Sequence, residues 1–110
     1  SANQVQTVWR DDSGTSITLT NAYTLGEVCV VSARKSGSQR QARKNGVVGG
    51  TSTTAMGPTT LTEATIGSWS VPSFHKGSIY PVIAIKGTVT DSDLLTLERF
   101  VGQLSGVSGI

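Results

Sequence analysis

The sequence predicts an all-β protein, an antiparallel jelly-roll-like sandwich with one short α-helix at its C-terminus. Aromatic residues make up only 5% of the 110 residues and glycine occurs 13 times, a composition typical of short strands joined by many turns. Asp-Ser-Gly and Asn-Gly turn signals separate alternating segments. A helical pattern of apolar residues occurs only near the end of the chain. The length fits a single β-sandwich domain spanning residues 1–110.

The first twenty residues predict a β-hairpin. Apolar and polar residues alternate over residues 4–9, and residues 11–14 supply a turn. The following strand carries Ile17 and Leu19 on one face. Asp11 and Asp12 fit turn chemistry, and a calcium or sugar ligand pair is the alternative.

A second hairpin is expected in the middle of the chain. Residues 27–34 predict a strand, residues 35–38 a turn, and residues 39–44 an antiparallel return that ends at Asn45-Gly46. Beyond it, we expect three further segments: a Gly/Ser/Thr-rich loop with at most a short edge strand over 49–60, a strand over 60–66 and a loop over 67–75.

The last third predicts a buried strand that leads into a helix. The apolar run 79–85 lies between two glycines and has the length and residue types of a buried strand. Thr90 is a good N-cap and Gly106 a good terminator. The apolar residues between them recur at three- and four-residue steps and predict one buried helix face: Leu94, Leu97, Phe100, Val101 and Leu104.

Several of these patterns together resemble the C-terminal portion of a concanavalin A-like lectin/glucanase domain. They are Ile66-Gly67, Phe74-x-x-Gly77-x-Ile79-Tyr80-x-Val82, Thr90-x-Ser92-Asp93 and Leu97-Glu98-x-Phe100-Val101. Gly26 to Val31 followed by Asn45-Gly46-Val47 resembles an earlier strand and hairpin of that family, so the match covers roughly residues 26 to 107. The versions most similar to it are the laminin-G-like domains of bacteriophage tail and virion proteins.

The resemblance implies a carbohydrate-binding or structural module. Domains of this family usually have more strands than this chain offers. The chain is therefore either the C-terminal part of a larger sandwich, such as a cleaved product, or a sandwich that neighbouring subunits complete. Both cases imply partners at exposed sheet edges.

Catalysis and membrane insertion find no support in the residue pattern. The hydrolases of the family carry a Glu-x-Asp-x-x-Glu strand, which is missing from this sequence, and no other catalytic motif occurs. His75 and Cys29 are the only histidine and cysteine, so we expect no metal site, no cofactor and no disulfide, with Cys29 a small buried hydrophobe. No apolar run is long enough to cross a bilayer, so the chain is expected to be soluble and not bound to a membrane.

Aromatic side chains on loops are the usual platforms for sugar rings, since a flat apolar face matches the C–H face of the ring. The glycan-binding candidates lie in one such stretch: Trp69, Phe74, His75 and Lys76. Two alternatives stay open at these positions, because Trp69 is equally suited to cap the core and His75 to be a solvated loop histidine.

The charge pattern supports a competing hypothesis. Five cations fall within eleven residues of the second hairpin: Arg34, Lys35, Arg40, Arg43 and Lys44. On one ribbon they are a footprint for nucleic-acid phosphates, or a solvated face that discourages edge pairing.

The two functional hypotheses share a setting. The first is a non-catalytic carbohydrate-binding or structural module of a phage or virus particle, such as a tail fibre, spike or capsid decoration. The alternative is a small viral coat protein whose basic hairpin binds nucleic acid. Both predict a homo-oligomer or other virion proteins as partners, and a location in the virion or outside the cell.

Overall fold

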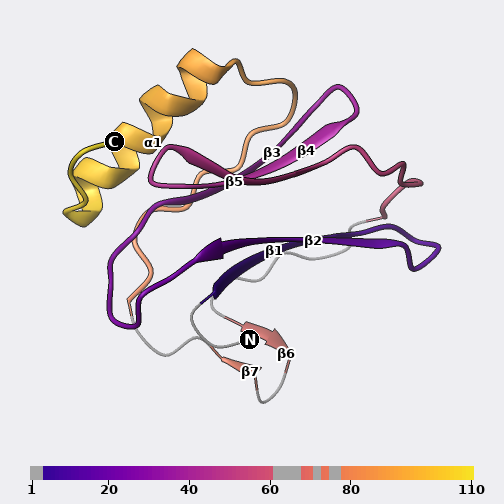
Figure 1. Cartoon of the computed structure of the whole chain (residues 1–110), viewed down its shortest axis with the longest axis horizontal. Coiled ribbons are helices and arrows are strands. Elements are labelled where there is room, and N and C mark those ends of the chain that lie inside the picture. Colours follow the sequence, from indigo (N-terminus) through magenta and orange to yellow (C-terminus); the bar gives the residue numbers. More distant parts are fainter. Residues whose placement is uncertain (1–3, 61–67, 71–72, 75–77) are drawn as a thin grey trace.

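The structure, a computed structural model, describes residues 4–60, 68–70, 73–74 and 78–110, with only the backbone at 68–70 and 73–74. Its elements form three layers: helix α1 lies over one face of the sheet β3-β4-β5, and the hairpin β1-β2 lies on the opposite face (Figure 1). The described chain is therefore mostly β with one C-terminal helix, as the composition predicts. In order the elements are β1 Gln4–Arg10, β2 Ser16–Ala22, β3 Val31–Ser36, β4 Gln39–Lys44, β5 Val47–Ser52, β6 Ser68–Ser70, β7 Ser73–Phe74 and α1 Asp91–Ser105.

The N-terminal hairpin is confirmed. β1 and β2 pair antiparallel from Gln4 opposite Ala22 to Arg10 opposite Ser16. Asp11 closes the turn because its Oδ1 accepts from the backbone amides of Ser13 at 3.0 Å and Thr15 at 2.8 Å. This arrangement is the turn chemistry that the sequence indicates.

The second hairpin is also confirmed, and it continues into a third strand. β4 occupies the predicted residues, and both residues of the Asn45-Gly46 turn have positive φ, 50° and 80°. One boundary was wrong, since β3 begins at Val31 instead of residue 27. β5 is an edge strand that covers the start of the segment 49–60, where a short edge strand was allowed. Three well-paired strands result, with β4 in the centre.

The main apolar core lies between β2 and the central sheet. Ile17 and Leu19 of β2 pack with Ala42 of β4, which is fully buried. Glycines let the layers approach closely: a Cβ on Gly50 would press on Leu19, and a Cβ on Gly49 would overlap the side-chain amide of Asn21. β4 is thus covered on both faces.

Helix α1 begins and ends at the predicted residues. The Thr90 hydroxyl accepts from the amide of Asp93 at 3.1 Å, and Gly106 ends the helix with a φ of 82°. The buried face differs from the expected one, because Leu94, Glu98 and Gly102 face inward. Phe100 and Leu104 of the predicted apolar face are about half exposed.

The predicted buried strand at 79–85 is wrong. This segment has no strand pairing, and all its residues are exposed. Pro81 interrupts it and lacks the N–H that a strand ladder needs, and none of the described sheets covers it. The apolar composition predicted burial, but it could not show which surface provides it.

Two further predictions concern residues 60–75. The strand expected at 60–66 falls outside the described residues except for Thr60. Within the segment expected to be a loop, β6 and β7 pair antiparallel as a small separate sheet.

No helix in the described part of the chain has the length and apolar character needed to cross a membrane.

Candidate functional site

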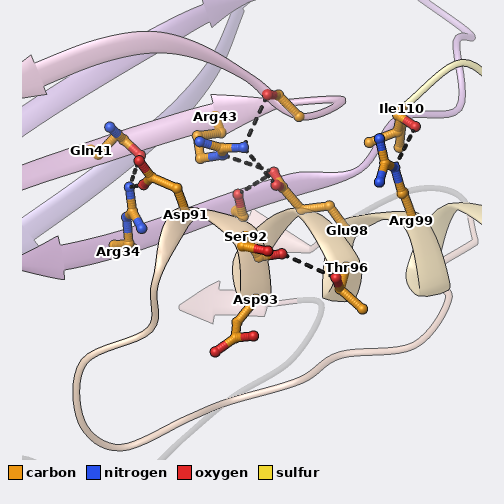
Figure 2. Close-up of polar contacts among 12 residues, drawn as sticks. Arg34, Gln41, Arg43, Asp91, Ser92, Asp93, Thr96, Glu98, Arg99 and Ile110 are labelled. Atoms are coloured by element: carbon orange, nitrogen blue, oxygen red, sulfur yellow. Dashed lines mark hydrogen bonds and ion pairs between the residues drawn. The ribbon is translucent and has the colours of Figure 1, made fainter.

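The helix and the sheet meet at a buried ion pair. Arg43 of β4 donates from Nε to Glu98 Oε2 at 3.0 Å and from Nη2 to Glu98 Oε1 at 2.8 Å (Figure 2). The Ser32 hydroxyl of β3 donates to Glu98 Oε2 at 2.9 Å. The Glu98 side chain is only 2% exposed and that of Arg43 is 8% exposed. A two-point contact of this kind fixes the position of the helix on the sheet as well as its distance.

The strand register explains why these groups converge. Ser32 lies opposite Arg43, so both side chains are on the sheet face toward α1. Glu98 follows Leu94 by four residues and precedes Gly102 by four, which places the carboxylate in the middle of the buried helix face. Arg43 Nη2 also donates to the carbonyl of Gly46 at 3.0 Å.

A second ion pair anchors the start of the helix. Arg34 of β3 binds the carboxylate of Asp91 and donates to the carbonyl of Val89 at 3.0 Å and to Gln41 Oε1 at 3.0 Å. The hydrogen bond and charge of Arg34 lower the pKa of Asp91 from its ordinary value. Arg34 thus ties the first helical turn to the edge strand.

A third pair lies on the other side of the sheet. Lys44 Nζ donates to Glu27 Oε1 at 2.6 Å and to the carbonyl of Ala22 at 2.8 Å. This hydrogen bond, together with one from the amide of Thr24, lowers the pKa of Glu27. Lys44 therefore joins the end of β4 to the end of the N-terminal hairpin.

The basic hairpin is consequently not the solvated ribbon of five cations that the sequence suggested. Arg34, Arg43 and Lys44 are paired with carboxylates inside the chain. Of the other two, Arg40 is buried and Lys35 is exposed. The structure brings all five onto β3 and β4, but it divides them between the two faces of the sheet. Contact with nucleic acid stays a prediction, and it now rests on Lys35 and Arg40.

Two of the four glycan-binding candidates lie in described strands, and the other two lie outside the described residues. Trp69 lies in β6 and Phe74 in β7, strands that pair with each other, and their side chains are not described. His75 and Lys76 lie outside the described residues. Their role in glycan binding stays a prediction.

An exposed apolar surface is the most unusual feature of the described chain. Five large side chains of the segment 79–85 are between 44% and 59% exposed: Ile79, Tyr80, Val82, Ile83 and Ile85. Beside this segment, a groove of about 490 Å³ runs between residues 30–35 of the edge-strand region and the apolar margin of α1, lined there by Leu97 and Val101. Val31, at the start of β3, is also 42% exposed.

The remaining polar candidates have structural roles. Asp11 accepts hydrogen bonds from the Ser13 hydroxyl and from the amides of Ser13, Thr15 and Gly57, which lower its pKa to about 2. Cys29 is half-buried, and burial raises the pKa of its thiol. Among the residues with described positions, no three histidine, cysteine or acidic side chains gather as a metal site would require.

The sequence interpretation missed the ion pair of Glu98 with Arg43 and the hydrogen bond between Asp11 and Gly57. The signal for Glu98 was a charged residue four positions after one helix-face leucine, together with a surplus of cations in the preceding hairpin. The backbone amide of Gly57 donates a hydrogen bond to Asp11 Oδ2 at 2.8 Å. The two residues are 46 positions apart, so no local sequence pattern predicts this contact.

No family model, curated protein or solved structure has a significant match to this chain. The resemblance to concanavalin A-like domains therefore stays a prediction.

Proposed function

We propose that this chain is a non-catalytic structural subunit of a phage or virus particle, and that it works as an assembly of identical copies. The observation that supports the proposal is the exposed apolar segment 79–85, whose five large side chains have no covering layer in the described subunit. Contiguous exposed apolar surface of this kind marks protein–protein contact sites. Its burial by a second copy would release water from both surfaces at once.

The neighbouring elements favour self-association. β3 is one of the two edge strands of the central sheet, so its outer N–H and C=O groups are open to pairing. The groove between β3, the segment 79–85 and α1 offers a place for an apolar segment from another subunit. A two-fold axis near this edge would let each copy present its apolar segment to the other. A jelly-roll-like sandwich completed by neighbouring copies fits this arrangement.

A structural role also agrees with how the carboxylates are used. Among the described residues, the buried carboxylates are those of Asp11 and Glu98, and each accepts hydrogen bonds from several donors within the chain. A general acid or base has to be free to exchange a proton with a substrate. The assignment to a phage or virus particle itself rests on the sequence resemblance.

The test is the size of the particle in solution. Light scattering behind a sizing column, with absorbance followed at two wavelengths that separate protein from nucleic acid, should show a homo-oligomer. Ile83→Lys places a charge in the apolar segment and should shift the protein toward the monomer. Leu25→Lys is the matched control, because Leu25 is 86% exposed on a loop away from the groove. A monomeric wild-type protein would overturn the proposal.

The carbohydrate-binding form of the proposal has its own test. Trp69→Ala should weaken binding in a glycan array while the unfolding temperature stays unchanged. Unchanged glycan binding would remove Trp69 from the site. An array without any hit would reject carbohydrate binding and keep only the structural role.

A further inference from the structure

A row of polar side chains crosses the central sheet on the face that carries the hairpin β1-β2. Lys35 of β3 lies directly opposite Arg40 of β4, and Arg40 lies opposite Ser52 of β5. Residues directly opposite each other in antiparallel strands have their side chains on the same face, with Cβ atoms roughly 5 Å apart. Two positive charges in such a pair repel each other.

Arg40 is buried without a carboxylate. It is 9% exposed, and the ion pairs among the described residues leave it without a partner. Its Nη1 donates to the carbonyl of Thr54 at a long 3.4 Å, and its buried Nε has no hydrogen-bond partner in the described part of the chain. Arg43, by contrast, has both its Nε and its Nη2 on one carboxylate.

Arg40, unlike Arg43, therefore lacks a counter-charge that an anion could provide. Burying a charge is costly unless a counter-charge or hydrogen bonds compensate it. An anion between Lys35 and Arg40 would remove their mutual repulsion and supply an acceptor for the guanidinium group. Lys35 is exposed, so such an anion would be accessible from solvent.

The groups around the row fit the oxygens of a phosphate. A guanidinium group, an ammonium group and hydroxyls are the side-chain donors that bind phosphodiester oxygens. Ser52 lies opposite Arg40 in the sheet, and the Arg40 guanidinium group keeps donors that are not used on any carboxylate. Because Lys35 stands on an open edge strand, the anion can belong to a polymer that continues along the surface.

We infer that Lys35 and Arg40 bind a backbone phosphate of a nucleic acid. The other three cations of the hairpin stay with Asp91, Glu98 and Glu27. Charge contacts to a phosphate carry no base information, so the binding is independent of sequence. The inference goes beyond the proposed self-association and does not depend on it.

The test is the salt dependence of binding to short fluorescent single-stranded RNA and DNA, followed by anisotropy. Wild-type protein should bind at low salt, with an affinity that falls as salt rises. Lys35→Gln should reduce the slope of log K against log salt by about 0.7, the value for one lost phosphate contact. Lys86→Gln is the matched control, since Lys86 is exposed on the segment after β7 and should leave the slope unchanged.

Arg40→Gln should reduce the slope in the same way, and its unfolding curve shows whether the fold persists. Because Lys35 is exposed, Lys35→Gln gives a result even if the Arg40 variant does not fold. Equal slopes for Lys35→Gln and wild type, or no binding at low salt, would overturn the inference. Binding of inorganic phosphate without binding of either oligonucleotide would overturn it too, in favour of a small free anion. Light scattering on the same samples reports self-association separately.

Discussion

The two sides of α1 differ in an instructive way. Where the helix faces the sheet, the buried centre is charged, with Glu98 held by Arg43 and Ser32. Where the helix faces the groove, Leu97 and Val101 are half-buried, and the neighbouring segment 79–85 is apolar and exposed. The usual distribution of polar and apolar residues is reversed between the two regions.

This reversal shows what each region contributes. A buried ion pair adds little net stability compared with an apolar pair, but it fixes one position of the helix on the sheet. The apolar segment 79–85 is about half exposed, so covering it would add hydrophobic stabilisation that the separate subunit does not have. The helix is thus positioned by charges in a way that keeps its apolar margin available for a partner.

The largest effect is expected from breaking the buried pair. Glu98→Ala leaves the Arg43 guanidinium buried without a counter-charge and should lower the free energy of unfolding by about 3–5 kcal/mol. Urea or thermal unfolding measures this loss. Gln103→Ala, at an exposed position of the same helix, is the control and should change stability by less than about 0.5 kcal/mol.

The double variant Arg43→Met/Glu98→Leu tests whether the two charges stabilise the fold only as a pair. It removes both charges, so it should be more stable than either single substitution. A double variant as unstable as the sum of the single ones would mean that the two groups do not form the pair described above.

The apolar contacts of the same helix should give the next largest effect. Leu94 is 8% exposed and Leu97 only half-buried, so Leu94→Ala should cost about 2–4 kcal/mol and Leu97→Ala clearly less. Unfolding curves of the two variants decide this order. Equal costs would mean that α1 buries the face predicted from its sequence and not the face that carries Glu98.

Asp11 tests a polar cluster outside the helix, by its pH dependence. Its pKa is near 2 in the folded state, below the ordinary 3.8, so the carboxylate favours folding above pH 4. That contribution is lost as the pH falls toward 2. Asp11→Asn should therefore lower the unfolding temperature at neutral pH and make it less sensitive to pH between 4 and 2. An unchanged acid sensitivity would assign the acid transition to other carboxylates.

Local signals predicted the elements that local chemistry specifies. Alternation and turn residues identified β1, β2 and β4, and the cap residues Thr90 and Gly106 fixed the ends of α1. The site was harder to predict because its contacts join distant residues, such as Arg43 and Glu98. The same composition that predicts burial for the segment 79–85 is expected of an interface, so the sequence could not separate a core strand from a surface for a partner.

The smallest effect on the subunit, and the clearest test of the comparison, is expected from Val82→Thr. Val82 is 59% exposed, so the substitution should change the stability of the separated subunit by less than about 0.5 kcal/mol. If copies associate through this segment, the unfolding temperature of the wild-type protein rises with protein concentration, because association stabilises the folded state by mass action. Val82→Thr should weaken that rise and match the wild type only at high dilution. A wild-type unfolding temperature that does not depend on protein concentration would show that copies of the chain do not associate through the apolar segment.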